Sequence, residues 1–352
     1  MNPVTHVITT IELGGAEKQL LILAAAQAKS GRKVRVYYLK GSPELANDFL
    51  SKGVSVNHEL ANRNFFTQVY LLRKIAFEEN EVVHAHLPQA ELSSALAGIG
   101  HKLVVTRHNS EPFWPKKPRF VSNLLSRFVC FRAEAVIAIS KAVKDFVVER
   151  GEVGPNITVD IVHYGSNSKY VKRPHRNSSL IFGTISRLTE QKDLPTMLRA
   201  FAIFSKSNSL AELHIIGQGH LQAHLNKIVQ ELGIHESVKW YGKQSEINTF
   251  LQSLDVFLLT SRYEGFGMVL LEAISNSVPI IASNNDAVIE VLGEDSPSLF
   301  SIGDYCELAN KMNQVQNFSF KEKIIESNLN RIPLFTVERM LDSLNSIYSR
   351  TV

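Results

Sequence analysis

Short apolar runs recur along this chain, and most of them end in residues that favour turns. Between the runs lie longer segments with helical apolar spacing, which predicts strands joined by amphipathic helices and hence parallel sheets. The predicted strands are 4–9, 34–39, 82–85, 103–106 and 135–139, followed by 180–185, 211–216, 238–241, 256–260 and 279–282. The predicted helices include 16–29, 89–98, 194–205, 220–232, 268–275 and 336–349.

The alternating pattern is interrupted once, at residues 171–179, which are polar, contain Pro174 and have no apolar period. A chain of 352 residues is long enough for two domains. We therefore expect an N-terminal domain over 1–170, a C-terminal domain over 171–335, and a last helix within 336–352 that packs back on the N-terminal domain. Ligands bind beyond the carboxyl ends of strands in such sheets, so the cleft between the two domains is the expected site.

Composition narrows the class of protein. Hydrophobic residues make up 44% of the chain and charged residues 20%, as in ordinary globular proteins. The N-terminus lacks the pattern of a secretory signal, and no apolar run approaches the roughly 20 residues that span a bilayer. Cys130 and Cys306 lie far apart and in no metal-ligand spacing. We expect a reduced, cytoplasmic protein.

Charge is distributed unevenly. Residues 1–170 contain 21 Lys and Arg against 15 Asp and Glu, whereas residues 171–352 contain 17 against 19. The excess in the first half suits an anionic membrane surface or an anionic acceptor, and it equally suits an ordinary solvated surface. Composition therefore leaves both interpretations open.

The segment 112–132 mixes aromatic residues with five basic residues and no acid. Such segments lie well at membrane interfaces, which would place the protein at the inner face of the cytoplasmic membrane. The alternative is a helix whose aromatic residues face the core. The predicted membrane or acceptor contacts are Phe113, Trp114, Lys116, Lys117 and Arg119.

The stretch 260–273, TSRYEGFGMVLLEA, carries the most informative chemistry. A predicted strand ends, a loop with Gly265 and Gly267 follows, and a helix begins. The first amides of a helix have no intrahelical partner and lie at the positive end of its dipole, so this junction suits a phosphate. Glu264 in the loop and Glu272 in the helix are suited to accept hydrogen bonds from pairs of sugar hydroxyls.

Two further strand ends add to this pattern. The segment 183–192, GTISRLTEQK, contains Arg187 and Lys192, and two cations stabilise a departing diphosphate. The segment 215–219, IIGQG, contains Gly217, where the backbone could come close to a ligand. Each loop alone is also typical of an ordinary strand-to-helix turn, so the argument depends on their combination.

Taken in order, the segments GTISRLTEQKDLPTMLRAF, LHIIGQG, YGKQSEINTFLQSLDVFLLTSRYEGFGMVLLEA and PIIAS resemble the retaining glycosyltransferases of family 4. The resemblance covers nearly all of 180–292 and is weaker in the first half. It implies an α/β protein of the GT-B fold, with two facing Rossmann-like domains. It also implies sugar transfer from a nucleotide-diphosphate sugar, UDP being favoured over GDP, with retention of configuration. The acceptor would be a glycan or lipid-linked glycan of a bacterial envelope pathway, such as polysaccharide or lipopolysaccharide O-antigen synthesis.

The same resemblance implies roles for single residues. Arg187 and Lys192 match the cations that bind the diphosphate, Glu272 the carboxylate that binds the ribose, and Glu264 the one placed against the donor sugar. His108, within VVTRHN, matches the active-site histidine near the reaction centre. These residues, apart from Glu272, are the expected catalytic group. The other expected donor contacts are Gly14, Gly15, Gly217, Gly265, Phe266, Gly267, Met268 and Val269.

The chain departs from the family pattern at two places. Ser277 stands where relatives usually have glycine, and Asp286 with Ala287 stands where a diglycine is common. We expect these departures to affect the local backbone path rather than donor binding.

A metal ion is not expected. His84 and His86 share one face of a strand but lack a third partner at a convincing spacing, so a structural or cleft-lining role is favoured. No Asp-x-Asp occurs in the sequence. The predicted enzyme therefore uses no metal or other cofactor, and Arg187, Lys192 and a helix dipole supply the positive charge.

Other functions remain possible for the same site. One is a GT-B sugar-nucleotide epimerase, which needs no acceptor, and another is a non-catalytic sugar-nucleotide-binding subunit. A dinucleotide dehydrogenase is disfavoured because no G-x-G-x-x-G follows the first predicted strand. No nucleic-acid partner is expected.

Overall fold

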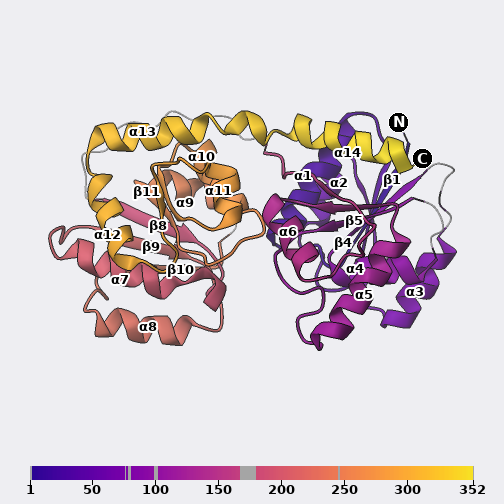
Figure 1. Cartoon of the computed structure of the whole chain (residues 1–352), viewed down its shortest axis with the longest axis horizontal. Coiled ribbons are helices and arrows are strands. Elements are labelled where there is room, and N and C mark those ends of the chain that lie inside the picture. The colour runs from indigo at the N-terminus through magenta and orange to yellow at the C-terminus, as the bar shows by residue number, and fades with distance from the viewer. Residues whose placement is uncertain are drawn as a thin grey trace. The chain divides into compact units, whose positions relative to one another are not determined.

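The computed structural model describes residues 2–75, 77, 81–98, 102–166, 180–244 and 246–351. The chain forms two compact units, which we call unit 1 (Met1–Ser166 with Phe335–Val352) and unit 2 (Asn167–Leu334). Each unit is a parallel sheet with helices packed on it (Figure 1). The predicted boundary at 171–179 lies outside the described residues.

Unit 1 contains a seven-stranded sheet in the order β3-β2-β1-β4-β5-β6-β7, with all pairs parallel. Its strands are β1 (Val4–Ile8), β2 (Val34–Tyr38), β3 (Ser55–Asn57), β4 (Val82–His86), β5 (Leu103–Arg107), β6 (Ala135–Ala138) and β7 (Val159–Ile161). Its helices are α1 (Gly15–Lys29), α2 (Ala46–Ser51), α3 (Phe65–Lys74), α4 (Pro88–Leu96), α5 (Arg119–Arg132), α6 (Lys141–Glu149) and α14 (Val337–Thr351). The central strands β1, β4 and β5 are buried at every position, as expected of a sheet covered on both faces.

The last helix, α14, packs in unit 1 although its residues are far from the rest of that unit in the sequence. It lies along α1, and Val337, Met340, Leu344 and Ile347 join the same apolar core as Val4 (Figure 1). Four residues at helical spacing form one apolar face, which is why this segment stays helical and docks by that face.

Unit 2 contains a six-stranded sheet in the order β10-β9-β8-β11-β12-β13, also parallel throughout. Its strands are β8 (Ile181–Ile185), β9 (Glu212–Ile216), β10 (Val238–Gly242), β11 (Val256–Leu259), β12 (Ile280–Ser283) and β13 (Leu299–Phe300). Its helices are α7 (Leu194–Ser205), α8 (Gln222–Glu231), α9 (Ile247–Ser253), α10 (Met268–Ser275), α11 (Asp286–Leu292), α12 (Tyr305–Gln314) and α13 (Phe318–Leu329), with short 3₁₀ turns at Glu190–Lys192 and Ile332–Leu334. The predicted α/β class with two Rossmann-like sheets is confirmed.

Strand order identifies one functional position in each sheet. In unit 1 the chain direction across the sheet reverses between β1 and β4, and in unit 2 between β8 and β11. Connections leave a reversal point on opposite faces of the sheet, so the space beyond its carboxyl ends stays open to a ligand. The two reversal points are therefore the places to look for a site.

The two departures from the family pattern have a local structural outcome. Ser277 has a φ of 53°, in the left-handed region that glycine occupies without strain. Asp286 begins α11, and the side chain of Asn285 caps that helix by accepting the amide of Val288. The backbone takes a capped helical turn here, so a diglycine is not needed.

Candidate active site

Three loops of unit 2 converge at the reversal point between β8 and β11. They follow β8, β9 and β11, and together with the start of α10 they contain all the donor residues predicted for the second half of the chain. The approach of the first two loops depends on glycine. Gly217 has a φ of 142°, and a Cβ built there would lie 1.7 Å from the carbonyl oxygen of Ser186. A Cβ at Gly219 would lie 2.2 Å from the carbonyl oxygen of Leu188, so larger residues would separate the loops.

The loops after β8 and β11 are joined by side chains. Lys192 Nζ lies 2.5 Å from Glu264 Oε1, and Thr260 Oγ1 donates to the Lys192 carbonyl at 2.8 Å. Gln191 donates to the Tyr263 carbonyl at 2.9 Å. The structure thus brings the predicted cation Lys192 and the predicted carboxylate Glu264 together, from positions 72 residues apart.

Arg187 lies in the same loop as Lys192. Its guanidinium is exposed and donates to Gln191 Oε1 at 3.0 Å. The chain turns at Asp193, between these cations and α7. Asp193 has a φ of 45°, in the left-handed region, and its carboxylate pairs with Arg262 at 3.3 Å. Aspartate is one of the few residues that tolerates this conformation. The tight turn ends the cationic loop and starts α7 directly.

Helix α10 begins at the end of the third loop. Gly267, with a φ of 81°, is its N-cap and provides no side chain to occupy the first amides. Phe266 is buried and fixes the loop in the core, whereas Glu272 is half-buried one turn into the helix. The first turn of α10 therefore lies at the positive end of the helix dipole and has no side-chain cap, which suits an anion.

In unit 1, the loop between β1 and α1 contains Gly14 and Gly15. A Cβ at Gly14 would lie 2.3 Å from Glu17 Oε2, so glycine allows the Glu17 carboxylate to fold over this loop. Glu17 also accepts from Thr10 Oγ1 at 2.5 Å, and its pKa is raised by burial. The sequence prediction identified the loop but not this carboxylate.

His108 follows β5 at the same edge of the sheet. Its Nε2 lies 3.0 Å from His86 Nδ1, and its Nδ1 lies 2.5 Å from the Tyr164 hydroxyl. Burial and the nearby Arg107 lower the pKa of His108 to about 3. His108 is therefore a neutral imidazole whose two nitrogens both have protein partners.

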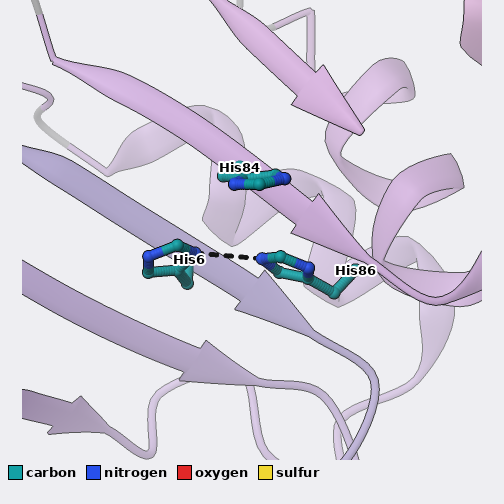
Figure 2. A group of neighbouring side chains, drawn as sticks. All are labelled: His6, His84 and His86. Atoms are coloured by element: carbon teal, nitrogen blue, oxygen red, sulfur yellow. Dashed lines mark hydrogen bonds between the residues drawn. The ribbon is translucent and has the colours of Figure 1, made fainter. Parts of the chain in front are cut away.

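Behind His108 lie three further histidines, drawn in Figure 2: His6 from β1 and His84 and His86 from β4. Their nitrogens lie within 4.8 Å of one another, a separation that could accommodate a metal ion. All six ring nitrogens, however, have hydrogen-bond partners. At least two of those hydrogen bonds would have to break to bind a metal, and the metal charge would be buried without a carboxylate among these ligands. The geometry fits a hydrogen-bonded network of neutral imidazoles better.

The protonation of these rings agrees with that assignment. Burial lowers the pKa of His6 to about 4. Burial and neighbouring histidines lower the pKa of His84 and His86 well below the usual value. A cavity of about 30 Å³ lies beside the network, between His84, His86 and His108 on one side and Leu344 of α14 on the other.

Comparisons with known proteins identify the family of the chain. A family model described as "Glycosyltransferase Family 4" matches residues 13–165, and one described as "Glycosyl transferases group 1" matches residues 167–328. Together they span nearly the whole chain. The chain belongs to glycosyltransferase family 4.

Two curated relatives of this glycosyltransferase are named for lipopolysaccharide or for an undecaprenol-linked glycan. It is 24% identical over 356 residues to a Campylobacter jejuni GalNAc transferase named for a diNAcBac-PP-undecaprenol-linked glycan, covering 97% of this chain and 96% of that one. It is 32% identical over 158 residues to the lipopolysaccharide 1,6-galactosyltransferase of Salmonella typhimurium. That second match spans only 43% of either chain.

Solved structures confirm the GT-B fold. Anabaena HepE, solved with UDP and glucose, superimposes with a TM-score of 0.81 at 17% identity, covering 99% of this chain and 100% of that one. The lipopolysaccharide outer core galactosyltransferase WaaB superimposes with a TM-score of 0.71 at 18% identity over the full length of both chains.

The basic-aromatic segment of this glycosyltransferase requires one correction. Phe113, predicted to contact a membrane or acceptor, is only 2% exposed and lies under the Arg107 guanidinium, 4.4 Å from ring to cation. The ring packs there because it covers a buried ion pair between Arg107 and Glu91. Trp114 is half-buried, and the predicted basic contacts Lys116, Lys117 and Arg119 are exposed.

The exposed aromatic surface lies further along the segment, on α5. Phe120, Leu124 and Phe131 are 73%, 68% and 79% exposed. They share one face because their spacings of four and seven residues correspond to about one and two helical turns. Among the described residues, no helix is long and apolar enough to cross a bilayer.

Sequence reasoning missed several residues around His108. The fold brings His6 to His86 and Tyr164 to His108. It also brings Gln27 to His6, and Tyr348 to Gln27 and His84. One signal was available in the sequence: His6 and His84 are polar residues inside apolar predicted strands, and His86 directly follows the second of these strands.

Proposed function

We propose that this glycosyltransferase transfers a sugar, with retention of configuration, from a UDP-sugar to a hydroxyl group of a glycan or lipid-linked glycan. The observation that carries the proposal is the convergence of Arg187, Lys192, Glu264 and the start of α10 at one reversal point. The named relatives transfer galactose or N-acetylgalactosamine, and HepE was solved with UDP. These names support the choice of donor and acceptor class.

In this proposal the diphosphate lies against Arg187, Lys192 and the first amides of α10. Lys192 has three ammonium hydrogens, so it can keep Glu264 as a partner while it donates to a phosphate oxygen. Glu264 would accept from hydroxyls of the donor sugar, and Glu272 from the ribose. Fixed positive groups at the leaving diphosphate stabilise the charge that develops as the sugar departs, without a metal ion.

His108 and the Gly14–Gly15 loop would contact the donor sugar. His108 is not proposed as a general base, because its nitrogens are engaged and its pKa is lowered to about 3. The acceptor proton would instead pass to the leaving phosphate as the new bond forms on the same face of the sugar. This course requires no covalent intermediate.

A thermal-shift titration against UDP-, GDP- and ADP-sugars tests the donor. A UDP-sugar at 100 times its dissociation constant should stabilise the protein by about 2.7 kcal/mol. A protein that is unaffected by every nucleotide sugar would contradict the proposal. If the protein converts the donor to an epimer in the absence of an acceptor, its reaction is epimerisation and not sugar transfer.

We further propose that α5 binds the anionic surface of a membrane that carries the acceptor. Phe120, Leu124 and Phe131 would enter the interface, with Arg127 and Arg132 beside them on the same helix facing lipid phosphates. The triple variant Phe120→Ser, Leu124→Ser, Phe131→Ser should lose co-sedimentation with phosphatidylglycerol vesicles.

Phe66→Ser is the matched control for this experiment. Phe66 is 82% exposed on α3, so its replacement should leave vesicle binding unchanged. Equal sedimentation of the wild type with neutral phosphatidylcholine vesicles, or unchanged binding by the triple variant, would contradict the membrane proposal.

A further inference from the structure

Two strings of hydrogen bonds in unit 1 meet at Gln27, a buried residue of α1. One string runs from Gln27 to His108, and the other runs from Gln27 through α14 to β5. We call the whole set the histidine network; it consists of Gln27, His6, His86, His108, Tyr164, Tyr348, His84 and Thr106.

The first string has a definite direction. Gln27 Oε1 lies 2.8 Å from His6 Nε2, and an amide oxygen can only accept, so His6 carries its hydrogen on Nε2. The Nδ1 of a neutral His6 is then an acceptor, and His86 Nε2, 3.0 Å away, must donate to it. By the same reasoning His86 Nδ1 accepts from His108 Nε2 at 3.0 Å. His108 Nδ1 is left as the acceptor of the Tyr164 hydroxyl.

The second string agrees with this direction. The Gln27 amide nitrogen donates to the Tyr348 hydroxyl at 3.4 Å, so Tyr348 can donate to His84 Nδ1 at 2.7 Å. His84 Nε2 then donates to Thr106 Oγ1 at 2.6 Å. Each buried ring is satisfied as a neutral imidazole with its hydrogen on Nε2.

Reversal of the network would require the Gln27 amide to rotate and every ring to change tautomer together. Burial makes an intermediate arrangement costly, because it would leave two donors or two acceptors facing each other. The identity and orientation of one amide therefore decide which nitrogen of His108 carries hydrogen, although Gln27 and His108 are 81 positions apart in the sequence.

We propose that Gln27, acting through His6 and His86, is a positioning residue that holds His108 as the neutral tautomer with hydrogen on Nε2. The tautomer is a property of unit 1 alone, whereas its importance for sugar transfer rests on the proposed function. The second ring nitrogen of a histidine commonly sets the orientation and tautomer of its functional edge, and here that partner is another histidine.

The test uses the full chain labelled with ¹⁵N in its histidines, and long-range ¹H–¹⁵N spectra at neutral pH. The wild type should show His108 with hydrogen on Nε2. Gln27→Met removes the acceptor of His6, which should shift part of the His108 signal to the tautomer with hydrogen on Nδ1. Gln27→Glu keeps an acceptor oxygen and should retain hydrogen on Nε2 of His108.

Gln68→Met is the matched control. Gln68 is also a fully buried glutamine of unit 1, but it donates to the carbonyls of Leu39 and Leu60 and lies outside the network. Its replacement should leave the His108 tautomer unchanged even if stability falls. A wild-type His108 with hydrogen on Nδ1, or a Gln27→Met spectrum identical to that of Gln68→Met, would overturn the proposal.

Kinetics then test the importance for transfer. Gln27→Met should lower kcat by roughly tenfold to 100-fold, the range for partners that orient functional imidazoles, with little change in KM for the nucleotide sugar. Equal kcat in Gln27→Met and Gln68→Met, together with a changed tautomer, would show that the tautomer does not matter for transfer. Because the spectra need no substrate, failure of the proposed function would not affect the tautomer result.

Discussion

Lys192 and Glu264 are the pair on which the proposed donor site depends. Their side chains are only 14% and 8% exposed, and the charged atoms are 2.5 Å apart. A buried charge that loses its partner strongly destabilises the folded protein. The two residues therefore form a buried ion pair and not an incidental surface contact. The pair holds a cation at a strand end while a second cation, Arg187, stays exposed to solvent in the same loop.

Lys192→Ala and Arg187→Ala should each raise the barrier to sugar transfer by about 3 kcal/mol, which is the cost of removing one preorganised group from a developing negative charge. The measurement is kcat/KM for transfer from the UDP-sugar. Lys227→Ala is the control, since Lys227 is exposed on α8 and pairs with Glu231 one turn away. Transfer rates equal to the wild type in both site variants would remove these residues from the mechanism.

At the residue scale, sequence patterns predict what lies in one continuous segment. Arg187, Lys192 and Glu264 were identified because strand ends and loop glycines mark them locally. Gln27 could not be identified from the sequence, because its proposed role depends on contacts with His6 and Tyr348, which lie near opposite ends of the chain. Phe113 was misplaced for a related reason: its burial is set by Arg107, and an aromatic residue has the same sequence signal inside and outside.

At the element scale, most strands and helices followed from apolar periodicity. The ten predicted strands all overlap observed ones, and 194–205 and 268–275 coincide with α7 and α10. The strands that were missed, β3, β7 and β13, have two or three residues each and lie at sheet edges. Such short strands bury few side chains, so they leave little pattern to detect.

Gly217→Ala tests whether the loops after β8 and β9 must touch. Its Cβ would meet the Ser186 carbonyl, so the loop carrying Arg187 should shift, and kcat/KM should fall roughly tenfold to 100-fold. Gly233→Ala is the matched control. Gly233 also has a positive φ, of 67°, but a Cβ there would have no neighbour within 4 Å. It should cost about 1 kcal/mol of stability and leave kcat/KM unchanged. Equal activity in the two variants would show that close loop contact is not required.

At the scale of the whole molecule, unit 1 contains an unusual set of buried titratable groups. His6, His84, His86 and His108 are neutral in the folded protein because burial lowers their pKa, to about 4 for His6 and to about 3 for His108. In the unfolded chain they gain protons near pH 6.5. A lowered histidine pKa therefore gives stability that is fully present above pH 6.5 and is lost as the pH falls toward 4. Glu91 acts in the opposite direction, because burial raises its pKa to about 7. Its contribution to the free energy of unfolding is present below about pH 4.5 and is lost as the pH rises to about 7.

Four buried histidines outweigh one buried glutamate, so the protein should be less stable at pH 5 than at pH 8. His6 and His108, with pKa values of about 4 and about 3, each contribute about 2 kcal/mol over that range, and His84 and His86 act in the same direction. Glu91 opposes them by at most about 3 kcal/mol. Urea unfolding at both pH values measures the difference. His84→Gln should reduce the pH dependence, whereas His224→Gln, at an exposed position of α8, should not. Equal unfolding free energies at the two pH values would contradict the neutral network.

The most direct measurement for the whole account is a crystal structure of the protein with UDP bound. We predict that the diphosphate lies within hydrogen-bonding distance of Arg187 and Lys192, with a phosphate at the first amides of α10 and the ribose at Glu272. A nucleotide bound elsewhere on the molecule, or a diphosphate that contacts neither Arg187 nor Lys192, would contradict the account.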